Sequence, residues 1–255
     1  CGEGETLLPP EVVGVVHAIL KQGHYVMVVT NGTIAKRFDE IAALPADCLD
    51  RLFIKFSYHY LQLKERNWLD LFFSNVQKVR EAGASISVEL TPSDEMIPHI
   101  NDAIAICKAR AGAVCHVTVA RDERNPDLAI LSGHSKGEYS QIWNRFDSAL
   151  FRFKLGVFGE KRYEFCYAGL WSGVLNLVTG QLAQCYRARF IQNIFEDLER
   201  SIEFSPVGHH CPEPHCYNAH VFMTLGVVPS VRTPAFAEMR NRVCADGSEW
   251  LKPAF

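Results

Sequence analysis

The stretch of sequence that decides the fold is residues 25–33, YVMVVTNGT. It begins with a continuous apolar run, residues 25–29, which is typical of a strand buried on both faces of a parallel sheet. The polar residues that follow predict that the strand ends near Thr30. Helices are expected on either side of the strand, over residues 11–20 and 34–44.

The same alternation of strands and helices continues to about residue 122. Because strands alternate with helices at this spacing, the sequence predicts βαβ units, a parallel sheet and right-handed crossovers. The fold class of this part is therefore α/β. Further strands are expected at residues 51–57, 85–90 and 113–119, and further helices at residues 67–82 and 96–111.

From residue 151 the pattern changes to short β-like pieces. Residues 174–178 and 181–185 flank a Thr-Gly pair and predict a hairpin. A helix is expected after the hairpin, at residues 188–199. We place a domain boundary near residue 150, with the α/β part at residues 1–150 and a small α+β domain at residues 151–255.

The composition narrows the classes of function. Of the 255 residues, 48% are hydrophobic and the formal charge is −3, so the chain is neither disordered nor collagen-like. The near-neutral charge predicts no nucleic-acid partner. The longest apolar run is too short for a membrane helix and the start lacks a signal-peptide pattern, so we expect no membrane partner and a cytoplasmic location.

Polar residues follow the expected strands at one edge of the sheet. Gly4 and Glu5 precede the first helix, Thr30-Asn31 end the first strand, Ser57 ends the next and Glu89 lies near the end of the third. Polar groups at successive strand ends are typical of a binding site at the carboxyl face of a barrel. Each residue taken alone could equally cap a helix or form an ordinary turn.

Nine cysteines are present and five of them lie in the last 90 residues. In a long chain with an α/β first part, metal or cluster ligation is a better expectation for this group than a disulfide framework. The hairpin would bring Cys166 and Cys185 side by side, and Cys211 and Cys216 can supply two more thiolates. Four thiolates suit a [4Fe–4S] cluster or zinc; buried, unreactive thiols are the third possibility. Cys244 competes for the fourth position.

The first 122 residues resemble the radical S-adenosylmethionine (radical SAM) enzymes. Residues 2–8, GEGETLL, resemble the family's glycine-glycine-glutamate-proline segment, with Thr6 in place of the proline. The resemblance implies a partial (β/α) TIM-type barrel and a site for S-adenosylmethionine, with the segment at the amino group of the cofactor's methionine. The implied cofactor-binding residues are Gly4, Glu5, Thr6, Thr30, Asn31, Ser57 and Glu89.

The C-terminal part resembles the auxiliary-cluster extensions of that family, called SPASM or twitch domains. The resemblance rests on the spacing C-x13-G-x4-C, from Cys166 through Gly180 to Cys185. It implies one auxiliary [4Fe–4S] cluster on Cys166, Cys185, Cys211 and Cys216. Full SPASM domains have seven cysteines for two clusters, so a single cluster is expected here.

The family's C-x3-C-x2-C element, which holds the radical-generating cluster, does not occur in this sequence. We therefore expect that the chain is the C-terminal portion of a longer protein whose missing segment carries a second [4Fe–4S] cluster; a degenerate member is the alternative. The chain alone is expected to be inactive.

For the parent protein, the resemblance implies a 5′-deoxyadenosyl radical that abstracts hydrogen from a peptide, protein or small-molecule substrate. It also implies an electron donor such as a flavodoxin or ferredoxin. Two other readings stay open. One is a non-catalytic metal-binding scaffold with zinc or an iron–sulfur cluster and a barrel remnant, and the other is a barrel lyase or aldolase that uses Lys55 or Glu89.

Overall fold

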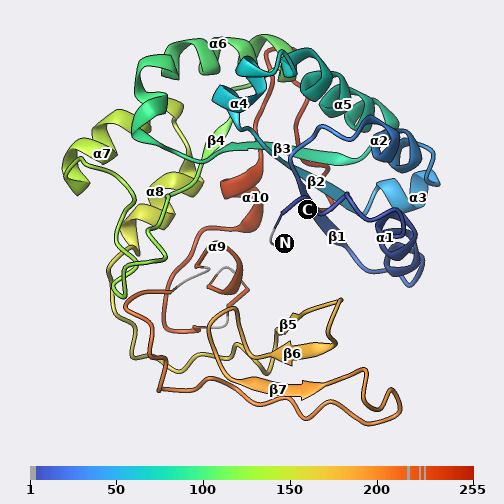
Figure 1. Cartoon of the computed structure of the whole chain (residues 1–255), viewed down its shortest axis with the longest axis vertical. Helices are drawn as coiled ribbons and strands as arrows, with labels where there is room; N and C mark the ends of the chain where they lie inside the picture. The colour runs from blue at the N-terminus through green and yellow to red at the C-terminus, as the bar shows by residue number, and fades with distance from the viewer. Residues whose placement is uncertain (1–3, 217–218, 224, 227) are drawn as a thin grey trace. The chain divides into compact units, whose positions relative to one another are not determined.

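The computed structural model describes residues 4–216, 219–223, 225–226 and 228–255. A four-stranded parallel sheet confirms the α/β class, with strand order β1-β2-β3-β4 (Figure 1). A closed TIM-type barrel is not shown by the residues that the structure describes. The strands are β1 (Val26–Thr30), β2 (Leu52–Ser57), β3 (Ser85–Leu90) and β4 (His116–Val117).

Helices connect the strands and lie along one side of the sheet (Figure 1). Four correspond to expected helices, and α3 and α4 are short additions. They are α1 (Val12–Lys21), α2 (Ala35–Ala42), α3 (Ala46–Leu49), α4 (Tyr60–Glu65), α5 (Leu69–Ala82) and α6 (Ile100–Ala111), with the 3-10 turn η1 (Asp94–His99) before α6. The elements α7 (Lys136–Trp143), η2 (Asn144–Phe146) and α8 (Ala149–Gly156) follow β4. Among the described residues, no helix is long and apolar enough to cross a membrane.

The chain divides into two compact units. Unit 1 comprises Cys1–Ala120, Leu131–Arg152 and Ala237–Phe255; unit 2 comprises Arg121–Ile130 and Phe153–Phe236. The last 19 residues, which the sequence boundary at residue 150 assigns to the second domain, thus belong to the unit that holds the parallel sheet. Backbone contacts explain this: the Ile86 N–H donates to the Trp250 carbonyl at 2.8 Å, and the Lys252 N–H donates to Ser85 Oγ at 2.9 Å.

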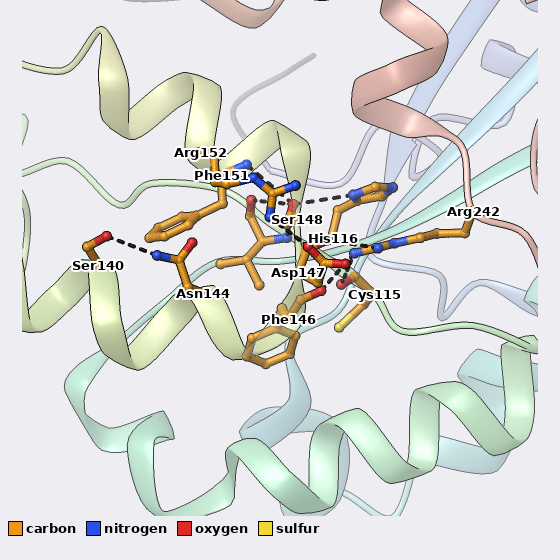
Figure 2. A network of polar contacts seen from close by, with 11 residues as sticks. Cys115, His116, Ser140, Asn144, Phe146, Asp147, Ser148, Phe151, Arg152 and Arg242 are labelled. Carbon is orange, nitrogen blue, oxygen red and sulfur yellow. Dashed lines mark hydrogen bonds and ion pairs between the residues drawn. The ribbon is translucent and has the colours of Figure 1, made fainter.

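Arg242 joins this C-terminal segment to the turn that follows η2 (Figure 2). Its guanidinium donates to the carbonyl oxygens of Phe146 and Asp147, both at 2.9 Å. Ser148 lies beside it and joins β4 to the same turn, because its Oγ accepts from the Val117 N–H at 3.2 Å. Carbonyl groups that no strand pairs are thereby satisfied by one half-buried side chain.

The two faces of the parallel sheet differ in chemistry. The face that the helices cover is apolar: Phe56 packs against Phe38 of α2 and Phe72 of α5, with ring centroids 5.5 and 5.7 Å apart. Side chains alternate between faces along a strand, so the neighbours of Phe56, Lys55 and Ser57, point to the opposite, inner face. A parallel sheet is usually apolar on both faces, and polar inner residues therefore call for a functional explanation.

Unit 2 contains a three-stranded antiparallel sheet, β5 (Val174–Leu175), β6 (Gln181–Ala183) and β7 (Phe190–Asn193). The hairpin predicted around Thr179-Gly180 is confirmed. Gly180 has a φ of +74°, and a Cβ there would lie 2.4 Å from Asn193 Oδ1, so the turn requires glycine. The short helix α9 (Ala219–Phe222) follows in unit 2, and the helix α10 (Phe236–Arg240) lies in unit 1 except for its first residue.

The helix predicted at residues 188–199 is wrong. Residues 190–193 form β7, which pairs with β6. Its register pairs Gln192 with Leu182 and Asn193 with Gln181. The ladder to β6 supplies backbone partners that outweigh the local helical pattern.

Candidate functional site

Glu5 ties the glycine-rich segment to the carboxyl end of β1. One oxygen of its carboxylate accepts from the Thr30 hydroxyl at 2.7 Å and from the Leu7 N–H at 2.9 Å, and the other accepts from the Asn31 N–H at 2.6 Å. The structure thus brings together three residues that the sequence analysis selected. Gly4 and Thr6 flank this contact; Gly4 is exposed and has nothing within 4 Å of the position a Cβ would take.

His59 lies at the same edge of the sheet, two residues beyond the end of β2. Its Nε2 lies 3.1 Å from Asn31 Oδ1. An amide oxygen only accepts, so Nε2 carries the proton and Nδ1 is left as an acceptor. Partial desolvation lowers the pKa of His59 and the cation of Lys55 lowers it further, while Glu5 opposes the shift. The ring is accordingly neutral near pH 7.

Glu89 forms the buried centre of the inner face. Lys55 Nζ lies 3.0 Å from Glu89 Oε1, and Arg240 of α10 forms an ion pair with Glu89 Oε2. The Glu89 and Arg240 side chains are 5% and 0% exposed, so water screens this pair little. Ser57 is the register partner of Glu89 on β2, which places these two predicted residues on neighbouring strands at one level.

His116 completes the inner face on β4, where it is the register partner of Glu89. Desolvation lowers its pKa to about 3, and Arg242 is the next cause of the lowering. Its Nδ1 lies 3.3 Å from Ser148 Oγ (Figure 2). His116 is therefore a neutral, buried residue that packs against Trp250.

The four predicted cluster ligands all lie in unit 2. Cys166, Cys185 and Cys216 pack against the same core, formed by Ala168, Ala219, Met223 and Val228. Burial is the largest cause that raises the pKa of Cys166 and of Cys185, and the neighbouring Cys211 raises both further. Cys166, Cys185 and Cys211 thus lie within electrostatic range of one another.

The loop that carries Cys211 is fixed by Lys161, whose ammonium donates to the carbonyls of Cys211 and Glu213, both at 2.7 Å. The donor set matches cluster chemistry. However, across the described ranges no group of three or more His, Cys, Asp or Glu side chains converges to hold a metal ion.

The other cysteines have structural surroundings. Cys244 lies in unit 1, with its Sγ 3.2 Å from the Arg80 guanidinium, and does not belong to the unit that holds the other four. Cys48, Cys107 and Cys115 are buried.

Sequence reasoning missed Arg240 and His59. Arg240 lies 151 positions from Glu89 and no local pattern marks it. A signal for His59 existed: it lies two residues beyond Ser57, so it continues the alternation that puts Lys55 and Ser57 on the inner face.

Neither a protein-family model nor a curated protein matches the sequence. Among solved structures, SuiB of Streptococcus suis, a radical SAM enzyme of the SPASM type, is similar with a TM-score of 0.48 and 11% identity. The match covers 79% of this chain and 51% of SuiB, so it spans about half the length of SuiB. At this level of similarity the likeness assigns neither family nor activity to the chain.

Proposed function

We propose that this chain belongs to a radical SAM enzyme and that the carboxyl edge of β1, β2 and β3 binds S-adenosylmethionine. The observation that carries the proposal is the Glu5 carboxylate, which fixes the glycine-rich segment against Thr30 and Asn31. The three residues to which we assign cofactor binding meet at one edge of the sheet, and ligands of parallel α/β folds bind at such edges.

The residues at this edge fit a polar, zwitterionic ligand. The main chain of Gly4 is exposed and offers room for an ammonium group. The half-buried Thr6 and Ser57 are further polar residues of the proposed site, and Glu89 belongs to it as the buried carboxylate that Lys55 and Arg240 hold. When bound and cleaved by one-electron reduction in the parent protein, the cofactor would supply a carbon radical for hydrogen abstraction, and the task of this chain would be to bind and orient it. A peptide substrate and a flavodoxin or ferredoxin donor are part of the same proposal.

Equilibrium dialysis with radiolabelled S-adenosylmethionine tests the site. The chain should bind one molecule saturably, and Ser57→Ala should weaken binding at least fivefold. Ser74→Ala, at an exposed position of α5, is the matched control and should leave binding unchanged. Equal affinity of the two variants would remove Ser57 from the site.

The auxiliary cluster is a separate part of the proposal, supported by the thiols of Cys166, Cys185 and Cys211. After anaerobic reconstitution, we expect iron and acid-labile sulfide in equal amounts. Cys185→Ser should lose both, whereas the buried Cys48→Ser should keep them. If the protein contains zinc and no acid-labile sulfide, the cluster proposal is wrong and the metal-binding scaffold is favoured.

A further inference from the structure

The inner face of the parallel sheet has a polar layer that the proposed cofactor site does not use. Lys55 lies in the middle of β2, and Ser87 of β3 is its register partner. Lys55 and Ser87 lie two residues before Ser57 and Glu89 along their strands. At the usual rise of a strand, this places them about 6.6 Å further from the carboxyl edge of the sheet.

The hydroxyl of Ser87 is fully buried and has no hydrogen-bond partner in the part of the chain that the structure describes. Buried hydroxyl groups in proteins nearly always have a partner, because burying one without a partner is unfavourable. The Ser87 hydroxyl can therefore still form a hydrogen bond, and this points to a ligand atom beside β3.

Lys55 supplies a positive charge on the same face: its backbone is level with Ser87, and its ammonium reaches the Glu89 carboxylate. Its ammonium has three N–H donors, and one of them bonds to Glu89 Oε1. Glu89 is shared with Arg240, so its charge is divided between two cations. The Lys55 side chain is 15% exposed, which leaves it within reach of a ligand that enters from solvent.

We propose that Lys55 and Ser87 bind a carboxylate group of the substrate on the inner face of the sheet. A carboxylate accepts from both donors at once and carries a single charge. The neighbouring Glu89 carboxylate disfavours a dianionic phosphate in the same place. This site goes beyond the proposed cofactor site and does not depend on it.

Thermal unfolding in sodium acetate tests the proposal, with sodium chloride at equal ionic strength as the reference and no S-adenosylmethionine present. Acetate should raise the Tm of the wild-type chain saturably. Lys55→Met should weaken the apparent affinity for acetate at least tenfold, and Ser87→Ala, which keeps the charge, should also weaken it. The matched control is Lys78→Met, at a solvent-exposed ion pair with Asp39, and it should behave as wild type.

If Lys55→Met does not fold, Lys55→Arg, which keeps the charge, and Ser87→Ala decide the test. The proposal is overturned if acetate acts no more strongly than chloride, if Ser87→Ala binds acetate as wild type does, or if inorganic phosphate stabilises more than acetate. Competition between S-adenosylmethionine and acetate would also overturn it, because the layer would then belong to the cofactor. A chain that binds acetate but not S-adenosylmethionine would contradict only the proposed function.

Discussion

The buried ion pair of Arg240 and Glu89 makes a quantitative prediction about stability. Arg240→Met keeps the length of the side chain but removes one of the two cations that face Glu89. Removing one partner of a buried pair costs about 3–5 kcal/mol. The loss here should fall at the lower end, about 3 kcal/mol, because Lys55 remains 3.0 Å from the carboxylate. For a chain of this size that corresponds to a fall in Tm of roughly 6–12 °C.

Urea unfolding followed by tryptophan fluorescence measures this free energy, since Trp68, Trp143 and Trp250 all lie in unit 1. The control is Arg152→Met, which removes an ion pair with Asp147 whose side chains are 52% and 84% exposed, and it should cost less than about 1 kcal/mol. An Arg240→Met variant as stable as this control would refute the reasoning that the pair is buried and poorly screened.

Three further predictions test other parts of the structure. Glu5→Ala should speed amide hydrogen exchange at Leu7 and Asn31, whose N–H groups lose their acceptor; unchanged exchange would refute the contact. Gly180→Ala should destabilise unit 2 in chemical denaturation by more than about 1 kcal/mol, and more than Gly159→Ala, which has a similar φ of +81° but open space around it. Because the folded pKa of His116 is about 3 against 6.5 in the unfolded chain, stability should fall as the pH falls from 6.5 towards 3. His116→Gln should remove up to about 1.4 kcal/mol per pH unit of that slope, and equal slopes would show that the ring is not buried.

Strand β1 was predictable because it is a continuous apolar run, and this local signal needs no tertiary information. Strands β2 and β3 carry polar residues such as Lys55 and Ser87, and they follow from the regular alternation of strands with helices. Thr30 and Asn31 could be selected because they follow the apolar run of β1, and Glu5 because it lies in the glycine-rich segment before the first helix. Their mutual hydrogen bonds could not be predicted, because they depend on how a loop 25 residues upstream returns to β1.

Long-range pairs account for most of what the sequence did not reveal. Arg240 contacts Glu89 across 151 residues, and residues 237–255 join the first unit through contacts with β3 that leave no periodic pattern. The helix expected at residues 188–199 was lost to strand pairing with β6, since a ladder partner outweighs weak helical periodicity.

The most direct test of the account is the binding of S-adenosylmethionine to the chain, with Glu5→Ala as the diagnostic variant. We predict saturable binding of one cofactor per chain, and at least tenfold weaker binding in Glu5→Ala, because Glu5 fixes the glycine-rich segment to Thr30 and Asn31. Absence of binding to the wild-type chain, or equal affinity in the folded Glu5→Ala variant, would contradict the assignment of this sheet edge as the cofactor site.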